Sequence, residues 1–486
     1  MKKNLIKNTV NTSPDYYCTW QTQLYLSDNG GPHGQRKNMT EAGLFGNEKG
    51  QGWAYFYEDA RQDLFLVMDD SWDVPFEDYE KYYGSLILDK GKFPESCNSN
   101  NTVKNLKNLT DKIKSLGWKG LGGWVCAQES EVYQKTSIEE YWKERLLWAK
   151  EAGFSYWKVD WGKSDSDFEF RKMLTDSGHK YAPELIIEQA KVQESIPVCD
   201  VFRTYDVPAI MSIPRTMNKC ADTLMHTCEE GYKGIINCED EVYFAAALGC
   251  AMGIMRHPMT GNLPNGEPDL SFPQMHRNLK TKIKEITRAV RWHRMAPAFG
   301  VNKEETYISD TMLCDRWQIE NQLAEIETWW NFRDGDVLED TAPSAITRGI
   351  KLPLVEADEN GFIPFIVASK NPNGTVSVAT LGRTNERDYF IPHCKVEIDA
   401  DNSKMFGIFG EYEKLIINVS YNTRKIKLYA QDISDCECED ITELAELKDG
   451  KIIIDGALIH RLGTKMNGAG DTSEPGLVVC VEKQER

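Results

Sequence analysis

The chain has 486 residues, of which 41% are hydrophobic and 27% are charged, as in globular proteins. This length exceeds that of an average domain, so we expect one large domain and one smaller domain. The formal net charge of −18 argues against nucleic acid and anionic membranes as partners, because both require basic surfaces.

The N-terminal segment MKKNLIKNTVNTSPDYY contains lysines but no apolar stretch long enough for a secretory signal. No apolar run reaches the roughly 18 residues that a membrane-spanning helix needs. The 13 cysteines are scattered and odd in number, which favours reduced thiols, many of them buried. We therefore expect a cytoplasmic protein.

Short apolar strands alternate with amphipathic helices from about residue 15 to residue 300. The run 64–68 predicts a strand that ends at Asp69 and Asp70, and apolar residues on one face predict a helix over about 101–116, closed by Gly117. Further strands are predicted at 120–125, 155–159, 185–187, 201–203, 234–237 and 253–255, and further helices at 138–152, 168–181, 241–252 and 279–295. About eight strand–helix units of this kind indicate a parallel sheet closed into a (β/α)8 TIM barrel.

The pattern changes after Pro297. Strand-like runs at 364–368, 375–379, 415–419 and 476–479 are broken by Asn-Pro-Asn-Gly and Asp-Gly turns, which predicts an antiparallel β-sandwich. We therefore expect a barrel domain with an N-terminal extension over 1–300 and a C-terminal β-sandwich domain over 301–486. The apolar segment 319–330 has a helix-like pattern but no definite place in this scheme.

Polar residues follow the predicted barrel strands at the point where each strand ends. They are Asp69, Asp70, Lys158, Asp160, Glu188, Arg203, Asp206 and Asn237, accompanied by the aromatic residues Trp20, Trp72, Trp124 and Trp161. One aspartate at a strand end is usually a helix cap or a turn residue. Polar residues at successive strand ends of a barrel instead collect at one mouth, so together they predict a functional site.

Asp160 and Asp206 are candidates for the two carboxylates that retaining glycoside cleavage requires, one as nucleophile and one as acid/base. Lys158 precedes Asp160 by two positions, so both side chains point into the barrel, and its charge would keep the nucleophile ionised. The acid/base must hold its proton, and the apolar residues on either side of Asp206 could provide the wall that raises its pKa.

This order of residues resembles the α-galactosidase clan of glycoside hydrolases, with the melibiase-like families 27 and 36 as the nearest. The matching elements over residues 15–300 are Asp-Asp-x-Trp on strand two, Gly-x-x-Gly-Trp on strand three, Lys-x-Asp on strand four, Glu on strand five and Arg-x-x-Asp on strand six. The resemblance implies an O-glycosyl hydrolase that retains configuration, cleaves terminal α-galactosides and uses neither a cofactor nor a metal ion.

The resemblance also implies a role for each matching residue. Asp160 would be the nucleophile and Asp206 the acid/base. The remaining residues would bind substrate, with Asp69, Asp70 and Lys158 on sugar hydroxyls, Glu188 and Arg203 near the 2-hydroxyl, Trp20 as an aromatic wall, and Trp72 and Trp124 beside them.

The sequence departs from the family pattern near the 2-position of the sugar. Ser71 stands where family 27 commonly has glycine, and the spacing from Arg203 to Asp206 is one residue shorter. The usual Glu-Trp-Pro after strand five is replaced by Glu-Gln-Ala-Lys, beginning at Glu188. The identity of the sugar therefore stays open.

Three other functions remain open beside an α-galactosidase. The first is an α-glycosidase for another unit, such as an N-acetylgalactosaminide, an arabinopyranoside or an isomaltose-type unit. The second is a non-catalytic carbohydrate-binding protein, which would not need both Asp160 and Asp206. The third is a metal-dependent barrel lyase or isomerase with strand-end carboxylates as ligands. In the leading interpretation the partner is an oligosaccharide or glycoside substrate, and a homo-oligomer is left open.

Two further sequence features are weaker candidates. His257 follows a predicted strand and could contact substrate, although a structural histidine is the more common case. Cys436 and Cys438 are too close together for a CxxC redox or zinc motif. The sequence contains no HExxH, P-loop or GxGxxG pattern, which argues against a metallohydrolase and against nucleotide binding.

Overall fold

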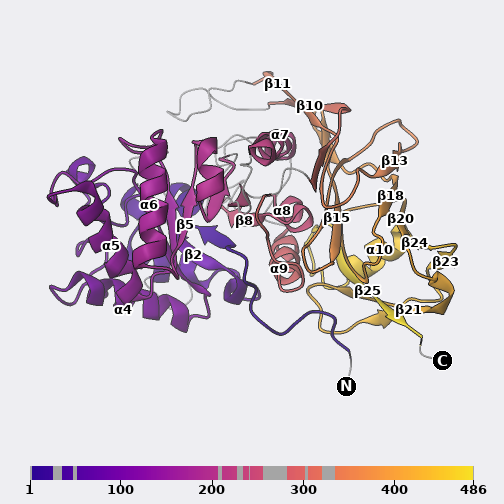
Figure 1. Cartoon of the computed structure of the whole chain (residues 1–486), viewed down its shortest axis with the longest axis horizontal. Helices are drawn as coiled ribbons and strands as arrows, with labels where there is room; N and C mark the ends of the chain where they lie inside the picture. Colours follow the sequence, from indigo (N-terminus) through magenta and orange to yellow (C-terminus); the bar gives the residue numbers. More distant parts are fainter. Residues whose placement is uncertain are drawn as a thin grey trace.

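The computed structural model describes residues 3–25, 36–46, 52–205, 211–226, 234–239, 241–255, 282–301, 305–319 and 334–484. Within these ranges, eight parallel strands form a closed barrel in sequence order, and strand β1 pairs with β8 to close it. Sheets formed by the C-terminal part of the chain lie beside the barrel (Figure 1). The predicted fold, a TIM barrel followed by C-terminal β-sheets, is confirmed.

Seven of the eight barrel strands lie at or near the ranges expected from the sequence, and β1 had no range of its own. They are β1 Tyr16–Cys18, β2 Phe65–Met68, β3 Gly120–Val125, β4 Tyr156–Val159, β5 Ile186–Gln189, β6 Val201–Arg203, β7 Ile235–Glu239 and β8 Ala251–Ile254. Side chains alternate along each strand, so Val67 and Tyr156 pack inside the barrel while Leu66 and Trp157 pack in the outer core. Gly122 leaves room for this interior packing, because a β-carbon there would lie 2.6 Å from Cβ of Tyr156.

Some helices of the barrel region begin or end at recognisable capping residues. They are α1 Trp20–Tyr25, α3 Glu41–Phe45, α4 Thr102–Ser115, α5 Ile138–Ala152, α6 Phe168–Tyr181, α7 Ser212–Met225, α8 Val242–Leu248 and α9 Ile283–Trp292. For example, α5 begins where Ser137 accepts a hydrogen bond from the Glu140 amide and ends at Gly153, which is left-handed at φ 69°.

Two expected boundaries are wrong. The helix predicted for 241–252 ends at Leu248, because Gly249 takes a left-handed conformation at φ 71°. The following strand, expected at 253–255, therefore begins earlier, at Ala251. Residues 279–281 of the helix predicted at 279–295 and almost all of the apolar segment 319–330 lie outside the described residues.

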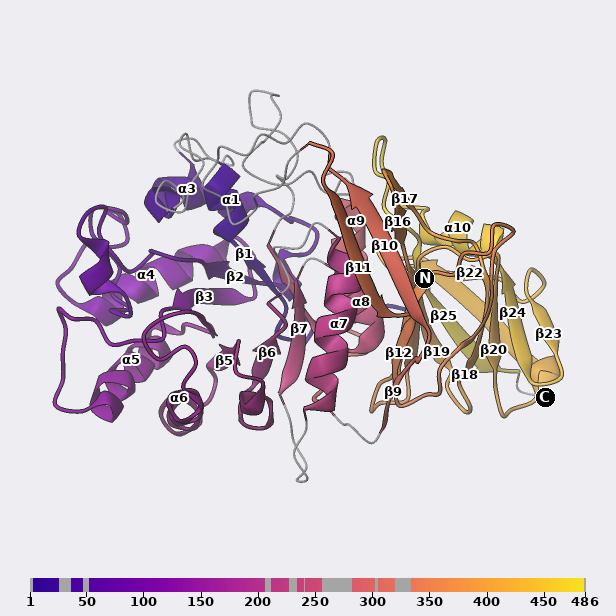
Figure 2. The same cartoon turned by 90° about the horizontal axis from the view of Figure 1, so that it is seen from above.

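The C-terminal sheets form two layers, seen nearly edge-on in Figure 2. The eight-stranded sheet has the order β22 (Glu439–Asp440), β21 (Ile426–Asp432), β25 (Gly476–Lys483), β19 (Met405–Phe409), β15 (Val376–Leu381), β14 (Phe365–Lys370), β12 (Ala345–Arg348), β9 (Thr306–Ile308). The five-stranded sheet has the order β13 (Leu354–Glu356), β18 (Lys395–Asp399), β20 (Lys414–Asn418), β24 (Lys451–Asp455), β23 (Glu446–Lys448). The pairing is mostly antiparallel, with β12–β14, β15–β19 and β18–β20 parallel.

Two short hairpin-like pairs and one helix complete the C-terminal part. They are β10 (Met312–Gln318) with β11 (Val337–Pro343), β16 (Arg383–Asn385) with β17 (Asp388–Phe390), and α10 (Gly456–Gly463). The space between the two large sheets is filled by apolar side chains such as Val378, Ile408, Leu415 and Ile454. This core is typical of a β-sandwich.

Helices α8 and α9 lie between the barrel and the eight-stranded sheet (Figure 1). Apolar side chains of both helices and of that sheet, among them Phe244 and Phe409, belong to one continuous hydrophobic core. Arg288 of α9 forms two hydrogen bonds with Asp432 of β21, at 3.0 and 2.8 Å, and both side chains are fully buried. The junction therefore fixes the barrel against the sandwich.

No helix in the described ranges is both long enough and apolar enough to cross a membrane. None of the cysteines described forms a disulfide, in agreement with the expected reduced thiols.

Candidate active site

Charged side chains from five of the barrel strands meet inside the mouth of the barrel. They are Asp69 after β2, Lys158 on β4, Asp160 after β4, Glu188 on β5, Arg203 on β6 and Glu239 on β7. None of the six is more than 7% exposed. We call this set the mouth cluster. Groups of this kind are almost never buried unless they are paired, so their partners determine what the cluster can do.

Arg203 is the centre of the mouth cluster. Its guanidinium lies 3.0 Å from Oδ1 of Asp160, 3.1 Å from Oε1 of Glu188 and 3.2 Å from Oε1 of Glu239. Only Nη1 donates a well-aligned hydrogen bond, to Glu239, while the contacts with Asp160 and Glu188 are ion pairs of poorer alignment. The guanidinium also lies 4.6 Å from the ring centre of Tyr205. Three strands are thus connected through one cation.

Asp160 is held as a carboxylate. The indole Nε1 of Trp124 donates a hydrogen bond of 3.0 Å to its Oδ2, and Arg203 faces its Oδ1. Burial by itself would raise the pKa of this carboxyl, but the charges of Arg203 and Lys158 and the indole hydrogen bond lower the pKa to about 2. Asp160 is therefore ionised at neutral pH.

Lys158 and Asp69 form a second buried pair, with 2.7 Å between Nζ and Oδ2. Burial and the nearby Arg203 would lower the pKa of Lys158, but Asp69 and the other acidic neighbours raise it above the ordinary value. The thiol of Cys18 donates to the same Oδ2 at 2.9 Å, and the backbone N–H of Asp70 donates to Oδ1 at 2.8 Å. The ammonium group of Lys158 is thus charged and fixed in position.

Asp70 has different partners from Asp69. Its Oδ2 lies 2.9 Å from Nε of Arg36, and its Oδ1 accepts a hydrogen bond of 2.7 Å from Ser71. Burial raises the pKa of Asp70 even though Arg36 opposes the shift. Arg36 in turn lies 5.8 Å from the ring centres of both Tyr83 and Trp161, so Asp70 belongs to a layer of aromatic and polar residues next to the mouth cluster.

Glu188 is a fully buried carboxyl group of the site. Its Oε2 accepts a hydrogen bond of 2.7 Å from Tyr156, and its Oε1 lies 3.4 Å from the hydroxyl of Tyr16. Burial raises the pKa of Glu188 to about 7, although Arg203 and Lys158 both act to lower it. Glu188 therefore exchanges a proton near neutral pH, in contrast to Asp160.

The predicted tryptophans occupy three different places. Trp124 and Trp161 lie with Tyr83 in an aromatic cluster, and their ring centres are 5.3 Å apart. Trp20 is half-buried and packs against the interior layer of the barrel. Trp72 packs in the outer core against Phe154, and its Nε1 donates to the backbone oxygen of Trp124. The structure thus brings Trp124 to Asp160 and leaves Trp72 outside the mouth cluster.

The structure describes one member of the catalytic pair predicted from the sequence. Asp160 lies in the mouth cluster, whereas Asp206 and the weaker candidate His257 lie outside the described residues. The buried side chain of Asn237 points into the barrel interior, and neither its oxygen nor its nitrogen has a hydrogen-bond partner.

Sequence reasoning missed several side chains of the site, namely Tyr16, Cys18, Arg36, Tyr156 and Glu239. Glu239 could have been found, because it lies two positions after Asn237 and so points to the same side of β7. The strand had been expected to end at Asn237. Tyr16 and Tyr156 looked like ordinary strand residues, and only the fold brings their hydroxyls to Glu188.

The carboxylates of the mouth cluster face lysine and arginine side chains rather than a common position for a metal ion. Among the described residues, no carboxylate belongs to a group of three candidate ligands close enough to hold a metal ion. Lys158 and Arg203 occupy the positions between the carboxylates. Such a cluster provides an ionised carboxylate, Asp160, together with hydrogen-bond donors and acceptors in fixed positions.

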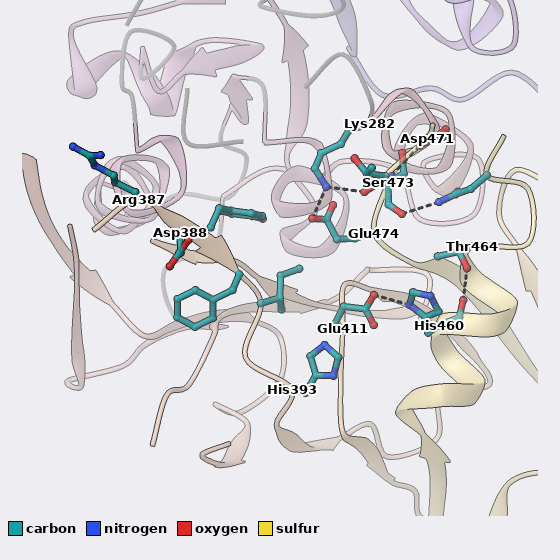
Figure 3. Close-up of a pocket in the computed structure, with 15 residues that line it drawn as sticks. Lys282, Arg387, Asp388, His393, Glu411, His460, Thr464, Asp471, Ser473 and Glu474 are labelled. Carbon is teal, nitrogen blue, oxygen red and sulfur yellow. Dashed lines mark hydrogen bonds and ion pairs between the residues drawn. The ribbon is translucent and has the colours of Figure 1, made fainter. Parts of the chain in front are cut away.

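A cavity of about 670 Å³ lies apart from the mouth cluster, beside the β16–β17 pair and α10 (Figure 3). Its ionisable groups are largely paired with one another: Lys282 lies 2.6 Å from Glu474, and His460 lies 2.7 Å from Glu411. No residue of the mouth cluster lines this cavity. It is therefore a separate feature of the surface.

No protein-family model and no curated protein matches the chain. Among solved structures, α-galactosidase I from Mortierella vinacea shares 10% identity over 97% of each chain, with a TM-score of 0.41. A β-L-arabinopyranosidase from Geobacillus stearothermophilus shares 10% identity over 97% of this chain and 96% of its own, with a TM-score of 0.43. A putative α-N-acetylgalactosaminidase from Bacillus halodurans shares 11% identity over the whole of both chains, with a TM-score of 0.42. At this level of similarity, the geometry and charges of the mouth cluster are the better guide to function.

Proposed function

We propose that the chain is a retaining glycoside hydrolase that cleaves α-glycosidic bonds, with terminal α-galactosides as its substrates and without a metal or cofactor. The observation that carries this proposal is the state of Asp160, a buried carboxylate at the mouth of the barrel whose pKa is lowered to about 2. A glycosidase nucleophile must be ionised. The low pKa of Asp160 supports its assignment to this role.

In the proposed reaction Asp160 attacks the anomeric carbon while the glycosidic bond breaks, which gives a covalent glycosyl-enzyme with inverted configuration. Water then attacks the same carbon, releases Asp160 and restores the original configuration. Arg203 and the indole N–H of Trp124 hold the carboxylate, one at each oxygen, so that it does not rotate between these steps. Their charge and hydrogen bond also make Asp160 a good leaving group in the second step.

We assign the acid/base role to Asp206, which follows β6 three positions after Arg203. It would donate a proton to the leaving oxygen in the first step and remove one from water in the second. Retention requires the two carboxyl groups to be roughly 5–5.5 Å apart, whereas a separation near 9 Å would mean inversion. A crystal structure with a bound sugar would measure this distance.

The remaining residues of the site would bind the sugar. Lys158 offers N–H donors, and Asp69, Asp70 and Glu188 offer acceptors for hydroxyl groups. Trp20 and Trp124 offer ring faces. Trp72, which the resemblance had included, has a packing position and is left out of this set.

A metal-dependent lyase or isomerase is less well supported. Asp69, Asp160 and Glu188 each face Lys158 or Arg203, and a cation placed among them would have to displace a buried ion pair. A carbohydrate-binding protein without catalysis gives no reason to hold Asp160 ionised beside an arginine.

The test is a screen of nitrophenyl α- and β-glycosides, with the anomer of the first product followed by NMR. We expect hydrolysis of an α-galactoside or of a closely related α-glycoside, with retention. Asp160→Ala should abolish turnover of all substrates, and azide should restore it and give the inverted glycosyl azide. Asp206→Ala should slow substrates with poor leaving groups by roughly 10²–10⁴-fold. Activated aryl glycosides should still form the glycosyl-enzyme, which then hydrolyses slowly after a burst of phenol. Asp176→Ala, an exposed change on α6, is the control.

Two outcomes would overturn the proposal. An inverted first product from the unchanged enzyme would exclude a double displacement. Full activity of Asp160→Ala and Asp206→Ala would exclude both assigned carboxylates.

A further inference from the structure

Three cysteine side chains converge in the layer between the barrel and its helices. Cys220 is on α7, Cys238 is on β7, and Cys250 directly precedes β8. Their sulfur atoms all lie within 4.8 Å of one another, and those of Cys220 and Cys238 are 3.4 Å apart. All three residues are fully buried. Three sulfur atoms from three separate elements therefore face one small volume.

The three cysteines lie outside the mouth cluster. Cys238 projects from the face of β7 opposite to that of Glu239. Because side chains alternate along β7, Asn237 and Glu239 point into the barrel while Cys238 points outward into the hydrophobic core. The buried Arg348 of β12 reaches this layer, donates to the backbone oxygens of Leu248 and Gly249 at 3.1 Å, and its charge acts on the nearby thiol of Cys250. The thiols thus have one fixed positive charge beside them.

The number and burial of the sulfur atoms restrict the ion that could bind. Thiolates prefer soft ions such as Cu(I) and Zn(II). Structural zinc takes four protein ligands, and open zinc sites complete the set with water. In the described ranges this group offers three ligands, and its complete burial leaves no solvent-exposed fourth position. Three-coordinate binding favours Cu(I).

We propose that Cys220, Cys238 and Cys250 form a trigonal site for one Cu(I) ion. A metal about 2.3 Å from each of three sulfur atoms in a plane would place the sulfur atoms about 4.0 Å apart. The present separations, 3.4 Å for one pair and at most 4.8 Å for the others, require shifts of well under 1 Å. Each thiol that binds loses its proton to solvent, and Arg348 offsets part of the remaining negative charge.

Occupation of this site would act on the mouth cluster through one peptide bond. Cys238 is followed by Glu239, whose carboxylate holds Nη1 of Arg203, and Arg203 faces Asp160. A metal that joins β7 to α7 and β8 would therefore fix the position of Arg203. This consequence rests on the proposed function, whereas the binding site itself does not.

The binding test uses the reduced full-length protein under anaerobic conditions. Cu(I) is supplied as its bicinchoninate complex, and its transfer to the protein is followed by loss of the complex's colour and by a copper–thiolate absorption in the near ultraviolet. We expect one tightly held Cu(I) per chain. Cys220→Ser, Cys238→Ser and Cys250→Ser should each lose it. Cys199→Ser should keep it, because Cys199 is equally buried but outside the group.

A second measurement needs no variant. The unchanged protein is unfolded in the presence of N-ethylmaleimide, with and without one equivalent of Cu(I), and the modified peptides are identified by mass spectrometry. Copper should delay modification of Cys220, Cys238 and Cys250, and not of Cys199 or Cys394. Protection of a different set, or transfer of no copper, would overturn the site. Either result would leave the glycosidase proposal untouched.

Discussion

The mouth of the barrel and the interior of the β-sandwich are both buried, but they contain opposite kinds of side chain. The sandwich interior is filled by aliphatic residues such as Val378 and Ile454, whose burial stabilises the fold by roughly 25 cal/mol per Å² of apolar surface. The mouth contains charged groups, each of which costs several kcal/mol to bury before it is paired. Apolar residues in the same positions would stabilise the barrel better. The burial of these charged groups therefore indicates a functional role rather than a structural one.

Two buried arginines, Arg288 and Arg203, differ in how they pair with carboxylates. Arg288, at the junction with the sandwich, makes two aligned hydrogen bonds with the single carboxylate of Asp432. Arg203 shares its guanidinium among Asp160, Glu188 and Glu239, and two of these contacts are poorly aligned. The first arrangement is typical of a structural ion pair. The second leaves Asp160 charged but incompletely satisfied.

The largest expected effect comes from replacing these two arginines by methionine. Removal of either one leaves buried carboxylates without their partner, so Arg203→Met and Arg288→Met should each lower the free energy of unfolding by roughly 3–5 kcal/mol in urea titrations. Only Arg203→Met should also raise the pKa of Asp160, because the main cation that lowers it is lost. Its acid limb of kcat/KM should move to higher pH.

The two variants serve as controls for each other. An unchanged pH profile in Arg203→Met would show that Arg203 has only a structural role. A shifted profile in Arg288→Met would remove the distinction between the two regions.

The next effect concerns Glu188. Because its pKa in the folded protein, about 7, exceeds the ordinary value of 4.5, the folded state binds a proton more strongly than the unfolded state between these values. This group therefore contributes its full stability below about pH 4.5, and the contribution, up to about 3 kcal/mol, is lost as the pH rises to 7.

Glu188→Gln imitates the protonated acid and should remove this pH dependence. The measurement is urea unfolding from pH 5 to pH 8, with the exposed Glu184→Gln as control. The two variants are expected to differ in slope across this range. Parallel curves for the wild type and Glu188→Gln would mean that Glu188 is ionised throughout.

The smallest effect distinguishes two tryptophans. Trp124→Phe removes the hydrogen bond to the carboxylate of Asp160, a contact worth roughly 1.5–3 kcal/mol, and should lower kcat/KM by about tenfold or more. Trp72→Phe removes a hydrogen bond to a backbone oxygen, worth about 1 kcal/mol, and should reduce stability without changing kcat/KM. Equal rate losses in both variants would place Trp72 in the site after all.

Local patterns were sufficient for most of the barrel. The helix expected at 138–152 coincides with α5, and the alternation along β4 correctly places Lys158 and Asp160 on the inner side. These features depend on capping, on apolar periodicity and on strand geometry, all of which act within a few residues.

The parts of the site that the sequence did not predict depend on contacts between residues that are far apart in the chain. Nothing near Arg203 in the sequence shows that it will contact Glu188 and Glu239 as well as Asp160, since these three residues come from three other strands. The short strand β1, Tyr16–Cys18, had no range of its own in the prediction, so Cys18 and Tyr16 were missed as well. A local pattern cannot reveal partners that only the closed barrel brings together.

The proposed mechanism requires Asp160 to form the covalent bond to the sugar. The direct measurement is incubation with a 5-fluoro α-glycosyl fluoride of the sugar identified by the screen, which slows hydrolysis of the glycosyl-enzyme, followed by peptide mass spectrometry. We expect one sugar per chain, attached at Asp160, and no label in Asp160→Ala. Attachment at another carboxylate, such as Asp69 or Glu188, or turnover without any labelled peptide, would contradict the account.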